Sequence, residues 1–208
     1  MGQRKEWVIG MTNVTFRIEG KTGYGTLPDS TTFLFDAEQI DKIKDIKWYR
    51  CYNKKYDATY ITNRSGRVLH KFLVECPSGY EVDHINRDTM DNRQCNLRIC
   101  THQQNQCNQA LQKNNTSGVS GVSYYPPRSK FRARIKVSHQ DIHLGYYSSF
   151  EEAVQARNVG MSYMFGEYAI YNDAPDPPSW IREKVIAQCR RFADLSICKA
   201  FSSSDCVA

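Results

Sequence analysis

The sequence lacks the features that direct a chain into a membrane or out of the cell. None of its apolar runs is long enough to cross a bilayer. The first residues, MGQRKEWVIGMTN, carry Arg and Lys but have neither the apolar core nor the small-residue cleavage site of a secretory signal. We therefore expect an intracellular protein that is not secreted, has no membrane partner and shows no sign of an obligate protein partner.

Metal-binding and disulfide signatures are also weak. The chain has eight cysteines, but no two of them form a C-x-x-C pair. An even count could supply disulfides, yet nothing points to an oxidising compartment, so reduced thiols are expected. There is no internal repeat.

The charge is only modestly unbalanced. Lys and Arg number 28 against 22 Asp and Glu, which gives a formal net charge of +6. A basic excess of this size suits a polyanionic partner but does not identify one.

The length of 208 residues and the 40% hydrophobic content allow one medium domain or two to three small ones. We predict an α+β chain with five segments. They are a β-rich module over 1–66, a polar segment that carries the chemistry over 67–111, a linker over 112–117, a sheet-and-helix unit over 118–173, and a proline-rich stretch, amphipathic helix and tail over 174–208.

Local patterns support the β-rich module. Val14, Phe16 and Ile18 alternate with polar residues, which is the period of a half-buried strand. Asp36 has Gln39 three residues after it, the spacing of a helix capping box. Two further apolar sets indicate a second strand and a core-facing helix: Phe33 with Phe35, and Ile40 with Ile43 and Ile46.

The sheet-and-helix unit has clearer signals. Ser149 and Glu152 form a capping box that begins a helix running to about Phe165, and residues 180–195 read as an amphipathic helix. We expect the first helix to pack on a three-stranded antiparallel sheet, whose strands are predicted over 121–125, 130–138 and 141–147.

One predicted strand has a cationic face. Its alternation directs Phe131, Ala133, Ile135 and Val137 to one side, and Arg132, Arg134 and Lys136 to the other. Such a face is usually only solvated, but three cations on one strand can contact phosphates and base edges. The residues expected near it are Tyr125, Arg128, Lys130 and His143.

The polar segment has its own layout of strand, loop, strand and helix. Asp83 and His84 lie between apolar neighbours in a predicted strand, Asn96 precedes a second strand, and Asn105 lies one turn into a predicted helix. Each could be structural by itself, because Asn96 could close a turn and Asn105 could be a solvated helix residue. Asp83 could pair with Arg87 or Arg98. Their joint spacing favours a catalytic site.

Residues 81–108, EVDHINRDTMDNRQCNLRICTHQQNQCN, resemble the HNH (ββα-metal) motif of phage homing endonucleases. LHKFL over 69–73 resembles the leucine-histidine segment that often precedes this motif, so the resemblance covers roughly 45–110. It implies that Asp83 and Asn105 hold one Mg²⁺ or Mn²⁺ ion, that His84 is the general base, and that Asn96 orients the His84 ring.

Nearby residues keep alternatives open. His70 has apolar flanks and is interpreted as structural, whereas His102 either contacts a phosphate or caps the helix. Arg98 is a candidate DNA contact. Related nucleases can carry structural zinc, but the spacing fits such a site poorly. Its ligands would be Cys95, Cys100, Cys107 and a histidine.

Residues 115–169, with GVSYY, IHLGYYSSFEEA and MFGEYA, resemble an AP2 DNA-binding domain. The sequence departs from the plant members at base-reading positions. Ser123 and Tyr125 replace arginines, and His143 replaces a tryptophan. The resemblance therefore implies the fold and the groove-binding mode, but not the base preference.

Taken together, the two resemblances imply a homing-type endonuclease that hydrolyses double-stranded DNA at a site positioned by the AP2-like unit. One alternative is a sequence-specific DNA-binding regulator whose HNH fold no longer cuts. Another is an RNA-binding protein that would use exposed aromatic platforms. The candidates for such platforms are Tyr124, Tyr125, Tyr146 and Tyr147.

Overall fold

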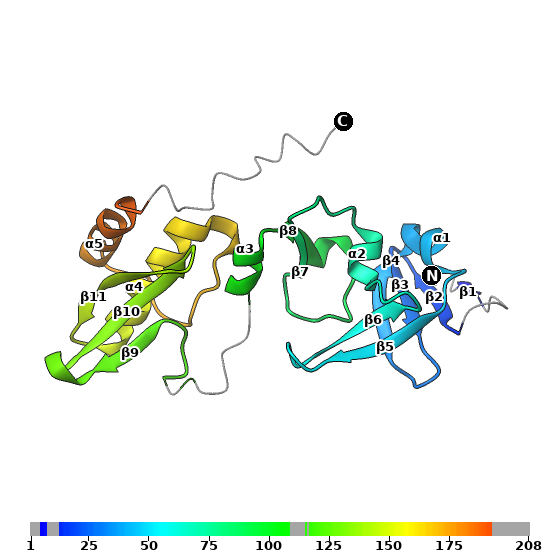
Figure 1. Ribbon diagram of the computed structural model, residues 1–208, viewed down its shortest axis with the longest axis horizontal. Coiled ribbons are helices and arrows are strands. Elements are labelled where there is room, and N and C mark those ends of the chain that lie inside the picture. The colour runs from blue at the N-terminus through cyan, green and yellow to red at the C-terminus, as the bar shows by residue number, and fades with distance from the viewer. Residues whose placement is uncertain (1–4, 8–12, 109–114, 116, 193–208) are drawn as a thin grey trace. The chain divides into compact units, whose positions relative to one another are not determined.

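The computed structural model describes residues 5–7, 13–108, 115 and 117–192, and it shows a mixed α/β chain with several small antiparallel sheets and few helices (Figure 1). The chain divides into two compact units, residues 1–102 and 103–208. Within the described residues, no helix is both long and apolar enough to span a membrane.

The first unit begins with a four-stranded antiparallel sheet. Its strands lie in chain order: β1 (Lys5–Trp7), β2 (Thr15–Glu19), β3 (Thr22–Thr26) and β4 (Thr32–Asp36). The elements that follow are η1 (Ala37–Gln39), α1 (Ile40–Ile43), the paired strands β5 (Trp48–Asn53) and β6 (Ala58–Asn63), and α2 (Leu69–Leu73).

Two phenylalanines of β4, Phe33 and Phe35, pack directly against glycines of the neighbouring strand β3. A Cβ atom on Gly23 would lie 2.3 Å from Phe35 Cζ, and one on Gly25 would lie 2.3 Å from Phe33 Cζ. Both rings are fully buried and meet the Phe16 ring edge-on. The alternation predicted for these strands is therefore confirmed.

The capping box predicted at Asp36 is wrong. Asp36 precedes η1, but its side chain makes no cap hydrogen bond there. Its Oδ2 atom accepts a hydrogen bond from Gln94 N at 2.6 Å instead. The competing donor lies 58 residues further along the chain, so the local spacing could not reveal it.

The polar segment folds together with the β-rich module. Leu34 N donates to Met90 O at 2.8 Å, and Asn92 N donates to Leu34 O at 2.9 Å. Leu69 and Leu73 of α2 are buried in the same core as the phenylalanines of the sheet. The segments separated at residue 66 in the sequence thus form one compact unit.

The remaining elements of the first unit hold the candidate site. β7 (Glu81–His84) pairs antiparallel with β8 (Leu97–Cys100), and the loop between them contains η2 (Gln94–Asn96). α3 (His102–Cys107) follows β8, and the division between the two units falls after its first residue.

The second unit is a three-stranded antiparallel sheet in the order β11-β10-β9, covered by a helix (Figure 1). Its elements are β9 (Val122–Tyr125), η3 (Pro126–Arg128), β10 (Lys130–Val137), β11 (Gln140–Tyr147), α4 (Phe150–Phe165), η4 (Gly166–Tyr168) and α5 (Ser179–Arg190). The three predicted strands and the helix that ends at Phe165 are confirmed.

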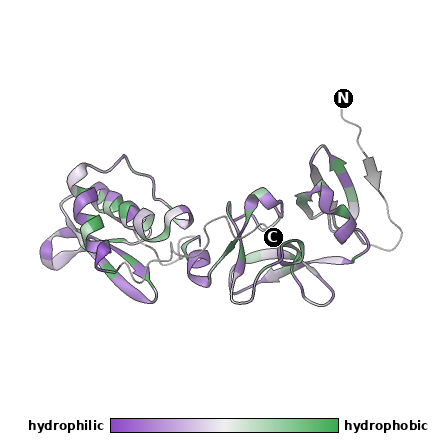
Figure 2. Cartoon of the chain, turned by 90° about the horizontal axis from the view of Figure 1, so that it is seen from above, coloured by the Kyte–Doolittle hydropathy of each residue, from purple (hydrophilic) through white to green (hydrophobic). Residues whose placement is uncertain are grey.

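Apolar residues of α4 and the sheet form the core of this unit (Figure 2). The predicted capping box is present, because Ser149 Oγ accepts from Glu152 N and Glu152 Oε2 accepts from Ser149 N. Ile181 and Val185 of α5 are also buried in this core. α5 ends at Arg190, and the last residues of the predicted helix lie outside the described part.

Candidate functional site

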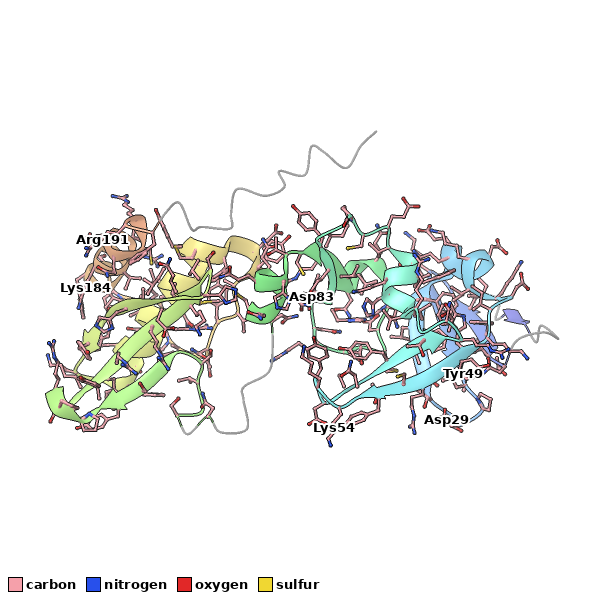
Figure 3. All side chains as sticks on the ribbon, viewed as in Figure 1. Asp29, Tyr49, Lys54, Asp83, Lys184 and Arg191 are labelled. Atoms are coloured by element: carbon pink, nitrogen blue, oxygen red, sulfur yellow. The ribbon has the colours of Figure 1, made fainter. Side chains whose placement is uncertain are left out.

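Asp83 and His84 end strand β7, and both are almost fully buried (Figure 3 labels Asp83). The β7–β8 register places Asp83 directly opposite Arg98. The Arg98 Nη2 and Nε atoms lie 2.9 Å and 3.0 Å from Asp83 Oδ2. The ion pair weighed as a structural alternative is therefore present, and it engages the candidate DNA contact Arg98.

The His84 ring is held by Asn92. His84 Nε2 lies 3.3 Å from Asn92 Oδ1, while Asn92 Nδ2 donates to Met90 O at 3.1 Å and points at Thr89 O at 3.5 Å. Because two carbonyl oxygens face Nδ2, the amide oxygen is the atom that faces His84. An oxygen can only accept, so His84 Nε2 carries a proton and, in the neutral ring, Nδ1 carries the lone pair.

Burial keeps His84 neutral. It lowers the pKa of the His84 ring below its usual 6.5, and the hydrogen bond to Asn92 and the nearby carboxylates of Asp83, Asp88 and Asp91 oppose this only in part. A neutral ring at physiological pH is the form that can accept a proton.

His70 packs against His84. The two rings meet edge-to-face with centroids 4.7 Å apart and planes at 79°. Burial lowers the pKa of His70 to about 3, and repulsion from the protonated form of His84 and from Lys71 acts in the same direction. His70 is therefore a neutral, buried neighbour that fixes the plane of the His84 ring, in line with its predicted structural role.

The side chain of Asn96 contacts backbone groups of the β7–β8 loop. Its Oδ1 atom accepts from Asn86 N at 2.9 Å, and its Nδ2 atom donates to Asp91 O at 2.8 Å. These bonds tie the two ends of the β7–β8 loop together. The residue that the structure brings to the His84 ring is Asn92, which the sequence analysis did not single out.

Two other predicted site residues follow β8 in the sequence. His102 Nδ1 lies 2.9 Å from Glu81 Oε1, and its side chain is largely exposed. Asn105 lies in α3, within the second compact unit. Its predicted pairing with Asp83 stays a prediction.

The donor chemistry fits a hard cation only in part. Asp83 supplies a carboxylate oxygen, the ligand type that Mg²⁺ and Mn²⁺ prefer. Across the described residues, no three His, Cys, Asp or Glu side chains gather in a way that could hold a metal ion. A site built from one carboxylate, one amide and water is not such a group, and it would bind a cation loosely until a phosphate completes the ligand set.

The cationic face of the second unit is present on β10 and its neighbours. The strand register places Tyr125 beside Lys130, Ser123 beside Arg132, and His143 beside Arg134. Arg134 Nη1 lies 3.5 Å from Asp141 Oδ2, so one acid offsets part of the charge. Lys136, the last cation of this face, is exposed on the same strand.

A β-bulge adds Tyr146 to this face. The register shifts between Ala133 and Arg134, so that Ala133 pairs with Gly145 and Arg134 pairs with His143. Tyr146 therefore lies on the cationic side, with its ring centroid 4.5 Å from that of His143, while Tyr147 is buried. Strict alternation could not reveal this exchange of faces.

Comparisons with known proteins match the segment that contains the candidate site. Residues 72–107 match the sequence profile of the HNH endonuclease family. An uncharacterized HNH endonuclease of Acanthamoeba polyphaga mimivirus is 28% identical over 149 residues, which cover 68% of this chain and 75% of that protein.

A second relative is viral as well. Protein 3.8 of Escherichia phage T7 is 34% identical over 59 residues, which cover 28% of this chain and about half (49%) of the phage protein. No solved structure matches the chain. The matched profile spans β7, the loop with Asn92, β8 and α3, which are the elements that hold the candidate site.

Proposed function

We propose that this protein is a metal-dependent DNA endonuclease of the HNH homing type, which hydrolyses phosphodiester bonds of double-stranded DNA inside a host cell. The observation that carries the proposal is His84, a buried and neutral imidazole whose tautomer is set by Asn92. It lies beside Asp83 in the segment that matches HNH endonucleases.

His84 supplies the general base in this proposal. Its Nδ1 atom takes a proton from the attacking water, because Nε2 already carries a proton that it donates to Asn92 Oδ1. The charge on the resulting imidazolium is stabilised by Asp83, Asp88 and Asp91, which all favour the protonated ring. His70 keeps the ring plane fixed during the transfer.

Asp83 and Asn105 would hold one Mg²⁺ or Mn²⁺ ion. When bound, such an ion stabilises negative charge on the phosphate and on the leaving oxygen. Both contacts from Arg98 go to Asp83 Oδ2, so the same carboxylate would serve the cation and the guanidinium together. Arg98 would contact a DNA phosphate beside this carboxylate.

The cationic face of the second unit would bind DNA in the AP2-like manner. Arg132, Arg134 and Lys136 supply contacts on β10, with His143 and Tyr125 beside them. Tethering a nuclease unit to a DNA-binding unit raises the local concentration of the cutting site near one sequence.

A second candidate function has one observation in its favour. The Asp83–Arg98 ion pair gives one oxygen of the carboxylate a protein partner, as a DNA-binding regulator whose HNH fold does not cut would also have. Cleavage distinguishes the two functions directly.

The test uses supercoiled plasmid that carries the DNA flanking this protein's gene. It is incubated with the full chain in Mg²⁺, in Mn²⁺ and in EDTA. We expect open-circular or linear product with either metal and none with EDTA. Absence of product with both metals, together with a gel shift on the same DNA, would refute the endonuclease and support the regulator.

A further inference from the structure

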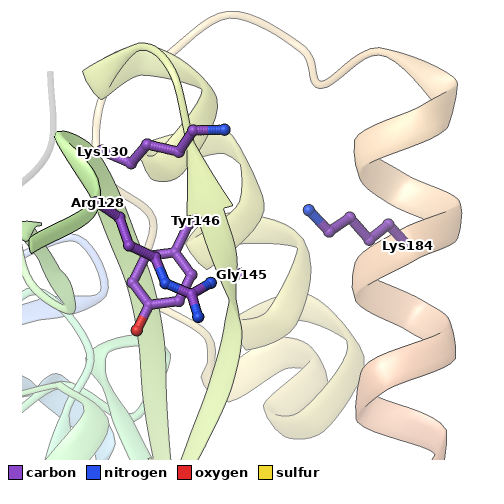
Figure 4. A pocket seen from close by; sticks show the side chains of 5 residues that line it. All are labelled: Arg128, Lys130, Gly145, Tyr146 and Lys184. Atoms are coloured by element: carbon purple, nitrogen blue, oxygen red, sulfur yellow. The ribbon is translucent and has the colours of Figure 1, made fainter.

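The second unit contains a pocket in which Lys184 of α5 joins two cations from beside the cationic face of β10. It has a volume of about 590 Å³ and lies between the sheet and α5 (Figure 4). Among its lining residues in the described part of the chain are three cations and no acid. These residues are Arg128, Lys130, Gly145, Tyr146 and Lys184.

Lys184 reaches the pocket because α5 is fixed against the sheet. Ile181 and Val185, on either side of Lys184, are fully buried. Lys184 Nζ lies 4.6 Å from the centroid of the Tyr147 ring, and Figure 4 shows the side chain extending from α5 toward the sheet. Gly145 permits this approach, because a Cβ atom there would lie 3.1 Å from Lys184 Nζ.

The other two cations, Arg128 of η3 and Lys130 of β10, come from the side of the pocket opposite α5. The Arg128 guanidinium stacks over the Tyr146 ring at 4.6 Å from its centroid, and Lys130 begins the next strand. Aromatic rings position cations without neutralising them, and none of the three cations makes an ion pair among the described residues. The pocket therefore keeps its positive charge.

His143 lies within reach of the charges on both sides of the pocket. Burial lowers the pKa of His143 first, and the charges of Arg132, Arg128 and Lys184 lower it further. One field thus spans the β10 face and α5 within the second unit.

We propose that the pocket between the sheet and α5 binds a phosphate group of the DNA backbone, so that Lys184 makes α5 part of the DNA interface. The inference rests on the proposed DNA binding by the second unit. Three cations around a concave site match a phosphate group, and lysine serves such sites as a point charge. DNA is favoured over a free phosphate because the pocket shares Tyr146 with the β10 face, where further phosphates would lie.

The test compares two charge-removing variants of the full chain on one helix. Lys184→Met removes one of the three positive charges of the pocket but keeps an apolar stem for Tyr147. Arg182→Met removes an exposed cation that does not line the pocket. Fluorescence anisotropy measures the dissociation constant of a 30-base-pair duplex of mixed sequence at several salt concentrations.

We expect Lys184→Met to reduce the slope of log K against log salt by about 0.9, because one phosphate contact is lost. Arg182→Met should leave the slope unchanged. Equal slopes for the wild type and Lys184→Met, while Arg132→Ala reduces the slope, would overturn the pocket but keep DNA binding by the β10 face.

Two further results would overturn the inference. No binding of the duplex by the wild type would overturn both the pocket and the proposed function. Saturable binding of inorganic phosphate that Lys184→Met abolishes, with duplex binding unchanged by that variant, would assign the pocket to a free phosphate.

Discussion

Two asparagines of the β7–β8 loop have different partners. Asn92 contacts the His84 ring, whereas Asn96 joins two backbone groups of the loop. The family resemblance assigned the orienting role to Asn96 by position alone. Which amide reaches the ring depends on the path of the loop, and that path is set by hydrogen bonds between Leu34 and the loop residues Met90 and Asn92, far apart in sequence.

Substitution of these asparagines should separate catalysis from folding. We expect Asn92→Ala to slow single-turnover cleavage by about tenfold or more, because the tautomer of His84 is no longer set, with little change in DNA affinity. Asn96→Ala should lower the free energy of unfolding by about 1–3 kcal/mol, because Asn86 N and Asp91 O lose their partner.

Cleavage rates, anisotropy and urea unfolding measure the three quantities. A wild-type cleavage rate for Asn92→Ala, combined with a stably folded Asn96→Ala that does not cut, would restore the assignment made from the sequence.

His70 should make the first unit less stable in acid. Its pKa is 6.5 in the unfolded chain and about 3 in the folded one, so the unfolded chain binds the proton between these values. Stability is therefore complete above pH 6.5 and falls as the pH decreases toward 3, by up to about 1.4 kcal/mol per pH unit. His70→Gln should make this slope shallower.

The measurement is urea unfolding at pH 5, 6 and 7 in a Trp180→Phe background. The remaining tryptophans, Trp7 and Trp48, both belong to the first unit and report its unfolding. The burial of His84 adds a contribution of the same sign that His70→Gln retains. Identical slopes for the two proteins would show that His70 titrates normally in the folded state.

At the scale of elements, the sequence was most informative where patterning is local. The strands and the capped helix of the second unit follow from alternation and from the Ser149–Glu152 box. The bulge opposite Ala133 was not predicted, because its cause is the pairing of β10 with β11 rather than the pattern of either strand. The capping box predicted at Asp36 was wrong for the same kind of reason, because the hydrogen-bond donor to the Asp36 side chain is Gln94, which is distant in sequence.

The capping box gives a prediction at this scale. Ser149→Ala should lower the free energy of unfolding of the second unit by about 1 kcal/mol, because Glu152 N loses its acceptor. Ser148→Ala is the matched control, since Ser148 contributes its backbone N–H to Glu152 and keeps it. Hydrogen exchange of the α4 amides measures both. An equal loss of stability in the two variants would contradict the capping role.

At the scale of the whole molecule, the proposed base His84 and the proposed metal ligand Asp83 belong to the first unit, whereas Asn105 and most of the proposed DNA contacts belong to the second. The resemblance to a nuclease motif could be recognised from the sequence because Asp83 and His84 are adjacent and the other motif residues follow within about 25 positions. The role of α5 was not readable, because Lys184 becomes informative only when the helix is placed against the sheet near Gly145.

The most direct test of the account is a paired measurement of single-turnover cleavage and DNA affinity for the wild type and His84→Ala in Mg²⁺. We predict that His84→Ala cuts roughly 10²–10⁴-fold more slowly, because the general base is lost, while its dissociation constant for DNA stays within about twofold. Cleavage at the wild-type rate, or an equal loss of cleavage and binding, would contradict the assignment of His84 as the base.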